Sequence, residues 1–342
     1  MPLLQFNDSG IFCEQANVYI DPWKKVDRAI ITHAHADHSR WGMKHYLAHH
    51  MSIPVMKLRL GQDISVQGIE YGEKLIINGV EFSLHPAGHI PGSAQIKVSY
   101  KGETWVVSGD YKTEADGIST PFEPVKCNTF ITECTFGLPV YHWKPQEEIF
   151  NEINLWWKKN KEEGLTTFIT AYSLGKAQRV IKNIDASIGK IFTHGAVENT
   201  NEALRVGGLK LPETIRVERG MDKNQFKGSL VVAPPSAINS PWMKQFKPAS
   251  LGIASGWMQL RGTRRRRAAD RGFALSDHAD WNGLLSAIKA TEAETVITTH
   301  GYTNVFSKYL NEIGIRSMEE KTLFTGESID NTEEDKLEGE AA

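Results

Sequence analysis

The sequence predicts an α/β protein in which one α/β domain is inserted into a larger, β-rich domain. Three observations support this prediction. Residues 1–145 read as many short strands separated by turn residues. Residues 146–267 alternate strands with helical patterns, which is typical of a parallel α/β unit. After residue 268 short strands return, each followed by a helix, so the β-rich pattern resumes.

The first segment contains the clearest strand signals. Apolar or alternating runs, each bounded by turn residues or ending on an acid or a histidine, predict strands at 27–33, 79–89, 94–100, 104–110 and 127–133. The runs AQIKVSY and TWVVSGD flank Gly102 and predict a hairpin.

The second and third segments add helices. Residues 146–164 place Ile149, Ile153, Trp156 and Trp157 at helical spacing, and the pattern stops at Gly164. Further helices are predicted at 173–184, 199–206, 281–292 and 303–314, between strands at 165–170, 190–194, 229–235, 272–278 and 293–300. Residues 326–342 hold seven acids and one lysine, which predicts a disordered acidic tail.

Composition narrows the class of protein. A length of 342 residues suits two domains, and a net charge of -2 means that a nucleic-acid partner must be recognised by a local patch. No apolar run is long enough for a membrane span, and the first residues lack a signal-peptide pattern. The three cysteines fit neither a disulfide framework nor zinc spacing, so we expect reduced thiols in a cytoplasmic protein with no membrane partner.

The stretch ITHAHADHSRWG, residues 31–42, carries the strongest chemical signal. It places His33, His35, Asp37 and His38 within six positions, directly after an apolar run. In a loop that leaves a strand, such spacing lets one loop serve two cations. Imidazole nitrogens and carboxylate oxygens are ligands that zinc and manganese accept. A polar loop with structural histidines is the alternative interpretation.

These residues resemble the HxHxDH motif of the metallo-β-lactamase fold, and the other motifs of that fold follow in order. Asp21 lies in YIDPW, His89 in PAGHIPGSA and Asp110 in VVSGDY. Three later segments resemble the motifs of the β-CASP nucleases, with Glu133 in FITECTFG, His278 in LSDHADW and His300 in ITTHGY. Among bacterial branches the sequence most resembles the ligase-associated DNA exonucleases, relatives of which are also labelled mRNA 3′-end processing factors.

The resemblance implies an αββα sandwich with an inserted α/β β-CASP cap domain. The sandwich would comprise residues 1–145 and 268–325, and the cap would comprise residues 146–267. It also implies two divalent cations, zinc or manganese, and a role for each motif residue. One cation would be held by His33, His35 and His89, the other by Asp37, His38 and His300, with Asp110 bridging both and Asp21 orienting the loop. Glu133 and His278 would act beside the scissile phosphate rather than as ligands.

Two adjacent cations can share a water and lower its pKa, and the resulting hydroxide can attack phosphorus. His278 would then supply a proton or hydrogen bond to the leaving oxygen, with Glu133 orienting it. The motif alone indicates a hydrolase, and the cap with its additional motifs favours nucleic acid as the substrate. The resemblance to the ligase-associated branch further implies a DNA exonuclease in DNA repair, with a functional link to a DNA ligase.

Two basic segments are candidate nucleic-acid contacts. RGTRRRRAADR, residues 261–271, contains Arg264, Arg265, Arg266 and Arg267, which suit backbone phosphates. A solvated arginine-rich face or an ion-pair network is the alternative. SLGKAQR places Ser173, Lys176 and Arg179 near a predicted helix N-terminus, which suits a terminal phosphate. Ordinary helix capping by Ser173 is the alternative there.

Three other functions compete with a DNA exonuclease. A ribonuclease of the same fold is favoured by His300, because RNA-processing members of the β-CASP group carry a histidine at that motif. A small-molecule metallo-hydrolase would use the same cations, but the inserted domain and the arginine run disfavour it. A non-catalytic scaffold is disfavoured because every ligand position is filled.

Overall fold

The computed structural model describes residues 2–260 and 269–324, and it divides the chain into two compact units. Residues 2–142 and 278–324 belong to the first unit, and residues 143–260 and 269–277 belong to the second. The sequence placed the boundaries at 145/146 and 267/268. The predicted acidic tail at 326–342 lies outside the described residues.

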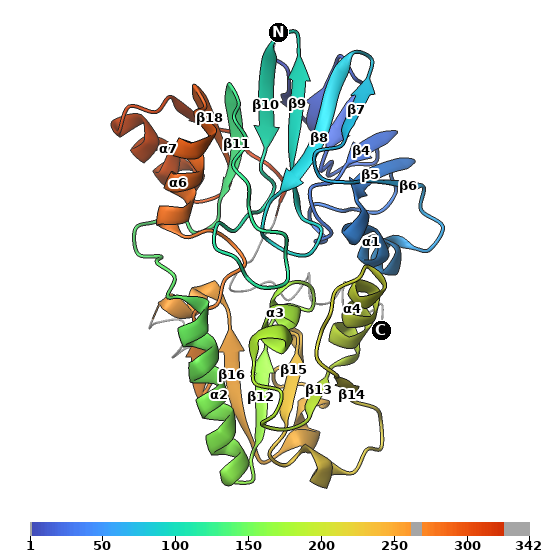
Figure 1. Ribbon diagram of the computed structural model, residues 1–342, viewed down its shortest axis with the longest axis vertical. Helices are drawn as coiled ribbons and strands as arrows, with labels where there is room; N and C mark the ends of the chain where they lie inside the picture. The colour runs from blue at the N-terminus through green and yellow to red at the C-terminus, as the bar shows by residue number, and fades with distance from the viewer. Residues whose placement is uncertain (1, 261–268, 325–342) are drawn as a thin grey trace. The chain divides into compact units, whose positions relative to one another are not determined.

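The first unit contains two sheets (Figure 1). The first sheet has the strands in chain order: β1 (Gln5–Asn7), β2 (Gly10–Cys13), β3 (Val18–Ile20), β4 (Arg28–Ile30), β5 (His45–His49) and β6 (Val66–Ile69). The second has the order β19 (Ser317–Glu319), β18 (Thr295–Gly301), β11 (Thr129–Cys134), β10 (Glu103–Val107), β9 (Ala94–Tyr100), β8 (Val80–Pro86) and β7 (Lys74–Ile77). The helices of this unit are η1 (His50–Ser52), α1 (Ile53–Leu60), α6 (Trp281–Thr291) and α7 (Thr303–Glu312).

Alternating side chains of the second sheet build two separate cores. Ile131 of β11 and Ile297 of β18 join the core that the two sheets share. Their neighbours Phe130 and Val296 point to the opposite face, as successive strand residues do. That face is covered by α6 and α7, which Figure 1 shows beside β11 and β18. Strands β11 and β18 are therefore buried on both faces of the sheet.

The second unit contains one sheet of six strands. Their order is β14 (Ile215–Arg216), β13 (Ile191–Thr193), β15 (Leu230–Ala233), β12 (Thr166–Thr170), β16 (Ala249–Ala254) and β17 (Arg271–Phe273). Its helices are α2 (Gln146–Glu162), α3 (Lys176–Asn183), α4 (Gly195–Val206), η2 (Lys223–Phe226), η3 (Pro235–Ala237), η4 (Met243–Phe246) and η5 (Gly256–Gln259).

All pairs in this sheet are parallel, as the strand–helix alternation predicts. Ile169 and Val232 face a core shared with α2, α3 and α4, whereas Phe168 and Val231 face a second core. Burial on both faces explains why these strands read as continuous apolar runs.

The predicted mixed α/β fold is confirmed, and most elements lie where the sequence placed them. The hairpin of β9 and β10 forms, and the helix predicted from Ile149, Ile153 and the two tryptophans is α2. One element differs. The strand expected to open the return to the first domain is β17, which pairs with β16 in the second unit. Among the described residues, no helix combines the length and hydropathy needed to cross a bilayer.

Candidate metal centre

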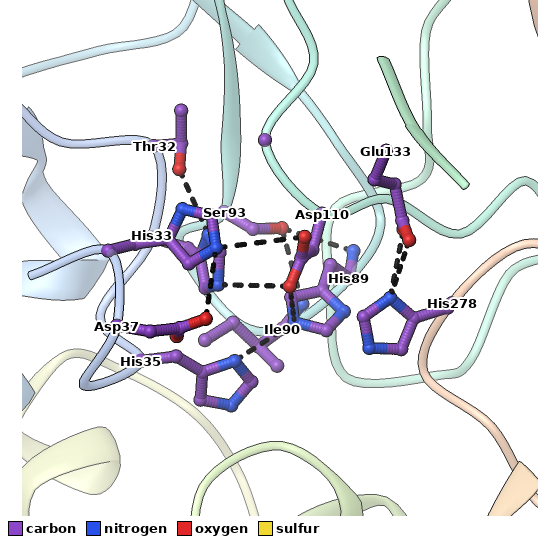
Figure 2. A network of polar contacts seen from close by, with 12 residues as sticks. Thr32, His33, His35, Asp37, His89, Ile90, Ser93, Asp110, Glu133 and His278 are labelled. Atoms are coloured by element: carbon purple, nitrogen blue, oxygen red, sulfur yellow. Dashed lines mark hydrogen bonds and ion pairs between the residues drawn. The ribbon is translucent and has the colours of Figure 1, made fainter. Parts of the chain in front are cut away.

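The loop that carries His33, His35, Asp37 and His38 follows β4, and we call it the histidine loop. His33 is fully buried, and Asp37 and His38 are almost so. His89 follows β8, and Asp110 follows β10. Residues from three separate strand ends are thus brought together, and Figure 2 shows Asp110 between the histidines and the side chains of Glu133 and His278.

Four residues place their metal-ligating atoms close together. The donor atoms of His33, His35, His89 and Asp110 all lie within 4.8 Å of one another. His89 Nε2 is 3.1 Å from His35 Nδ1, and Asp110 Oδ2 is 3.6 Å from His33 Nε2 and 3.8 Å from His89 Nε2. Ligands bound at about 2.1 Å in a tetrahedral site are about 3.4 Å apart. The spacing therefore fits a divalent cation.

Hydrogen bonding supports the same fit. Within the described residues, His33 Nε2, His38 Nε2 and Asp110 Oδ1 are buried but form no hydrogen bond. Buried polar atoms without a partner are costly, and native proteins keep few of them. Bound cations at the two donor groups would satisfy these atoms. His/Asp clusters of this kind indicate divalent metal binding, without specifying which metal.

A second group of donors lies on the other side of Asp110. His38 Nε2 is 3.6 Å from Asp37 Oδ2 and 3.7 Å from Asp110 Oδ1. Asp110 thus offers Oδ2 to the first group and Oδ1 to the second, the arrangement expected of a bridging carboxylate. His300 is buried near the end of β18. Burial raises the pKa of Asp110 overall.

Asp21 forms hydrogen bonds with Thr32 and His38. Its Oδ2 is 2.8 Å from His38 Nδ1 and accepts a hydrogen bond of 2.5 Å from the hydroxyl of Thr32. Its Oδ1 accepts from the Thr32 amide at 2.8 Å. The Thr32 hydroxyl is also 3.0 Å from His33 Nδ1. Because Nδ1 is occupied in both rings, Nε2 is left to face the cation position.

Two supporting residues were not found from the sequence. Thr32 connects Asp21 to His33, and the Ser93 hydroxyl accepts the amide hydrogens of His89 and Ile90. The position of Thr32 directly before the first histidine was an available signal. Ser93 lies in an ordinary turn, and nothing in its sequence neighbourhood marked it.

A glycine directly before a ligand shapes the site. Gly109 has φ +56°, a left-handed conformation, and a Cβ there would lie 2.7 Å from the side chain of Thr32. This close approach brings the turn that carries Asp110 against Thr32, which contacts His33.

Glu133 and His278 form a buried pair next to the cluster. His278 Nδ1 lies 2.9 and 3.0 Å from the two carboxylate oxygens, and both residues are almost fully buried. The carboxylate also accepts the amide hydrogens of Tyr111 and Thr135. Burial alone would raise the pKa of Glu133, but His278 and these hydrogen bonds lower it overall. Donor atoms of Asp110, Glu133 and His278 lie within 4.8 Å of one another.

The pKa values of His33 and His38 are shifted in opposite directions. Burial and the neighbouring histidines hold the pKa of His33 well below its usual value. Burial also acts to lower the pKa of His38, but Asp37, Asp110 and Asp21 raise it to about 10.

The candidate phosphate contacts of the second unit are buried. Lys176 Nζ is 3.6 Å from Asp277 Oδ2, and Arg179 is 3.2 Å from Asp277 Oδ1 and donates to the Ser276 carbonyl. Lys176 and Arg179 are only 1% and 2% exposed, and Ser173 is buried near them. Lys176 and Arg179 thus pair with Asp277 in this structure, and their contact with a terminal phosphate stays a prediction. Arg264, Arg265, Arg266 and Arg267 lie outside the described residues.

Comparison with known proteins agrees with this fold. Residues 8–149 match the family model of the metallo-beta-lactamase superfamily. This part of the chain is a metallo-β-lactamase domain, and the resemblance predicted from the motifs is confirmed.

Particular relatives extend the match. The chain is 26% identical over 311 residues to a protein of Opitutus terrae named a probable DNA ligase, covering 90% of this chain and 30% of that one. It is 26% identical over 202 residues to a ribonuclease of Thermus thermophilus, covering 51% and 44% of the two chains. The chain thus spans less than half the length of either relative.

A solved structure supports the fold. It is a protein of unknown function from Enterococcus faecalis V583, with a TM-score of 0.59, 11% identity, and coverage of 86% of this chain and 78% of that one.

Proposed function

We propose that this chain is a two-metal-dependent phosphodiesterase that acts on nucleic acid, as a DNA exonuclease in DNA repair. The observation that carries the proposal is the four-donor cluster of His33, His35, His89 and Asp110 beside the Glu133–His278 pair. The similarity of nearly the whole chain to a relative named a probable DNA ligase supports DNA as the substrate and a functional link with a DNA ligase.

In this proposal zinc or manganese occupies two positions. His33, His35 and His89 would hold one cation, Asp37, His38 and His300 would hold the other, and Asp110 would contribute to both positions. Bound cations would supply Lewis acidity and a water of lowered pKa. Asp21 and Thr32 keep the imidazoles of His38 and His33 turned with Nε2 toward the cations.

His278 is the proposed proton donor. Its Nδ1 contacts Glu133, so its Nε2 is the atom that can reach the leaving oxygen. With Nδ1–H directed at the Glu133 carboxylate, a protonated His278 would present Nε2–H as the donor. Glu133 is a positioning residue in this account because it acts through His278.

A ribonuclease is the second candidate function. The relative named a ribonuclease and the presence of His300 favour it. The residues of the centre act on a phosphodiester and do not by themselves distinguish deoxyribose from ribose.

A side-by-side digestion tests the proposal. The purified full chain, with manganese or zinc, is incubated with end-labelled single-stranded DNA, duplex DNA and RNA of one sequence. Each substrate is supplied with and without a 5′-phosphate, and Asp110→Ala controls for contaminating nucleases. Stepwise shortening of DNA with RNA intact is the expected result. Internal cleavage of RNA with DNA spared would establish the ribonuclease instead, and no cleavage of either would refute both.

A further inference from the structure

The last described residues of the first unit contact the metal centre from outside the known motifs. We call residues 320–324 the C-terminal strap. The Glu320 amide donates to the Thr298 carbonyl at 3.0 Å, and the Thr322 hydroxyl donates to the Thr299 carbonyl at 2.8 Å. The strap therefore runs along the end of β18, directly beside the backbone that carries His300.

The strap also reaches the histidine loop. Arg40 donates through Nε to the Asp37 carbonyl at 3.2 Å and through a terminal nitrogen to the Leu323 carbonyl at 2.7 Å. One guanidinium thus joins the loop backbone to the strap backbone. Because the contact with the strap is to the Leu323 backbone carbonyl, it depends on the backbone path of the strap rather than on its side chains.

Phe324 packs on a proposed ligand. Its ring stacks on His38 with centroids 4.2 Å apart and planes 13° apart. It also approaches His300 edge-on at 6.4 Å and Trp23 at 5.7 Å. Asp21 already fixes His38 Nδ1, so the motion left to the imidazole is a tilt about that contact. A ring stacked on its face opposes this tilt.

We propose that the C-terminal strap is part of the metal centre, with Phe324 as a positioning residue for the cation held by Asp37, His38 and His300. The inference rests on the proposed two-cation function. The strap contacts described above reach Asp37, His38, Thr299 and His300, all on the side of this second cation. Loss of the strap should therefore weaken the second cation selectively, and groups that orient metal ligands are typically worth about 10- to 100-fold in metal affinity.

The test is a calorimetric titration of Mn²⁺, and separately of Zn²⁺, into the chelator-treated full chain. Wild type is compared with Phe324→Ala, Phe324→Tyr and Arg40→Met. Met318→Ala is the control, because it removes an apolar side chain that is 40% exposed and precedes the strap. Thermal melting of each metal-free variant shows whether it folds.

We expect two ions per wild-type chain. Phe324→Ala should bind the first ion with unchanged affinity and the second at least tenfold more weakly. Phe324→Tyr should restore wild-type binding, and Arg40→Met should weaken the second ion even if Phe324→Ala proves unfolded. If Phe324→Ala and Arg40→Met bound the second ion as tightly as wild type, the proposal would be overturned. Equal weakening of both ions in these variants would overturn it as well. Fewer than two ions on wild type would instead refute the two-cation function itself.

Discussion

At the residue scale, Asp110 is the side chain on which both proposed cation positions depend. Its two carboxylate oxygens face different donor groups, with Oδ2 near His33 and His89 and Oδ1 near His38. We predict that Asp110→Ala abolishes metal loading and nuclease activity together, with residual activity below about 1% by analogy with other metal-centre losses. Metal analysis after gel filtration and a nuclease assay check this. Retention of two ions would contradict the bridging role.

His278 should behave differently from the ligands. We predict that His278→Ala keeps both ions but lowers kcat by about 10²- to 10⁴-fold, the usual contribution of a general acid or base. The variant should fold, because Glu133 keeps the amide donors of Tyr111 and Thr135. Metal content and single-turnover cleavage are measured on the same preparation. Loss of an ion in this variant would make His278 a ligand.

Site residues could be predicted from the sequence where they lie close together in the chain, but contacts between distant residues could not. His33, His35, Asp37 and His38 could be identified because four ligand-type residues within six positions are a local pattern. The contact between Arg40 and Leu323 joins residues 283 positions apart, and no periodicity or spacing reports it. Lys176 and Arg179 suggested a phosphate site, but their partner Asp277 is about a hundred residues away.

At the element scale, the turn after β10 decides where Asp110 points. We predict that Gly109→Ala destabilises the protein by about 2 kcal/mol or more, because left-handed backbone costs about 1 kcal/mol for alanine and overpacking adds about 1–3 kcal/mol. Gly102→Ala is the matched control, since Gly102 also has positive φ but a Cβ there meets nothing within 4 Å. Urea unfolding of both variants measures the difference. Equal destabilisation would mean that contact with Thr32 costs nothing.

Helix α4 carries a buried carboxylate with a predictable pH dependence. Glu198 accepts hydrogen bonds from Thr193, Asn201, Arg205 and Thr214. Burial acts to raise the pKa of Glu198, but these donors lower it overall. Since the folded pKa lies below the unfolded one, the stabilisation is present above about pH 4.3 and is lost as pH falls through the folded pKa.

We therefore predict that Glu198→Gln costs about 2 kcal/mol at pH 7 and progressively less as the pH falls below about 4. Urea unfolding at pH 7 and pH 3.5 measures both values. Glu202→Gln on the same helix is the control, because the Glu202 side chain is 61% exposed and should change stability by less than about 0.5 kcal/mol. If the destabilisation caused by Glu198→Gln grew toward low pH, the pKa of Glu198 could not be lowered in the folded state.

At the scale of the whole molecule, the sequence predicted the two kinds of architecture but not their boundary. Parallel pairing in the second unit followed from strand–helix alternation, and the β9–β10 hairpin followed from a glycine between two alternating runs. The run GFALSDH was assigned to the first domain because it leads to His278. Its strand β17 instead completes the edge beside β16, and sheet membership of an edge strand depends on a partner far away in the chain.

The location of the proposed ligands in one unit leads to a thermal prediction. The proposed ligands all belong to the first unit, whereas the second unit has its own two cores. A ligand that binds only the folded state stabilises it by about 2.7 kcal/mol at 100 times its Kd. We expect added Mn²⁺ or Zn²⁺ to raise the melting temperature of the unfolding step that involves the first unit, and EDTA to lower it again. Calorimetry of wild type and Asp110→Ala measures this. A metal-dependent shift that persists in Asp110→Ala would place the cations elsewhere, because that variant lacks the carboxylate facing both positions.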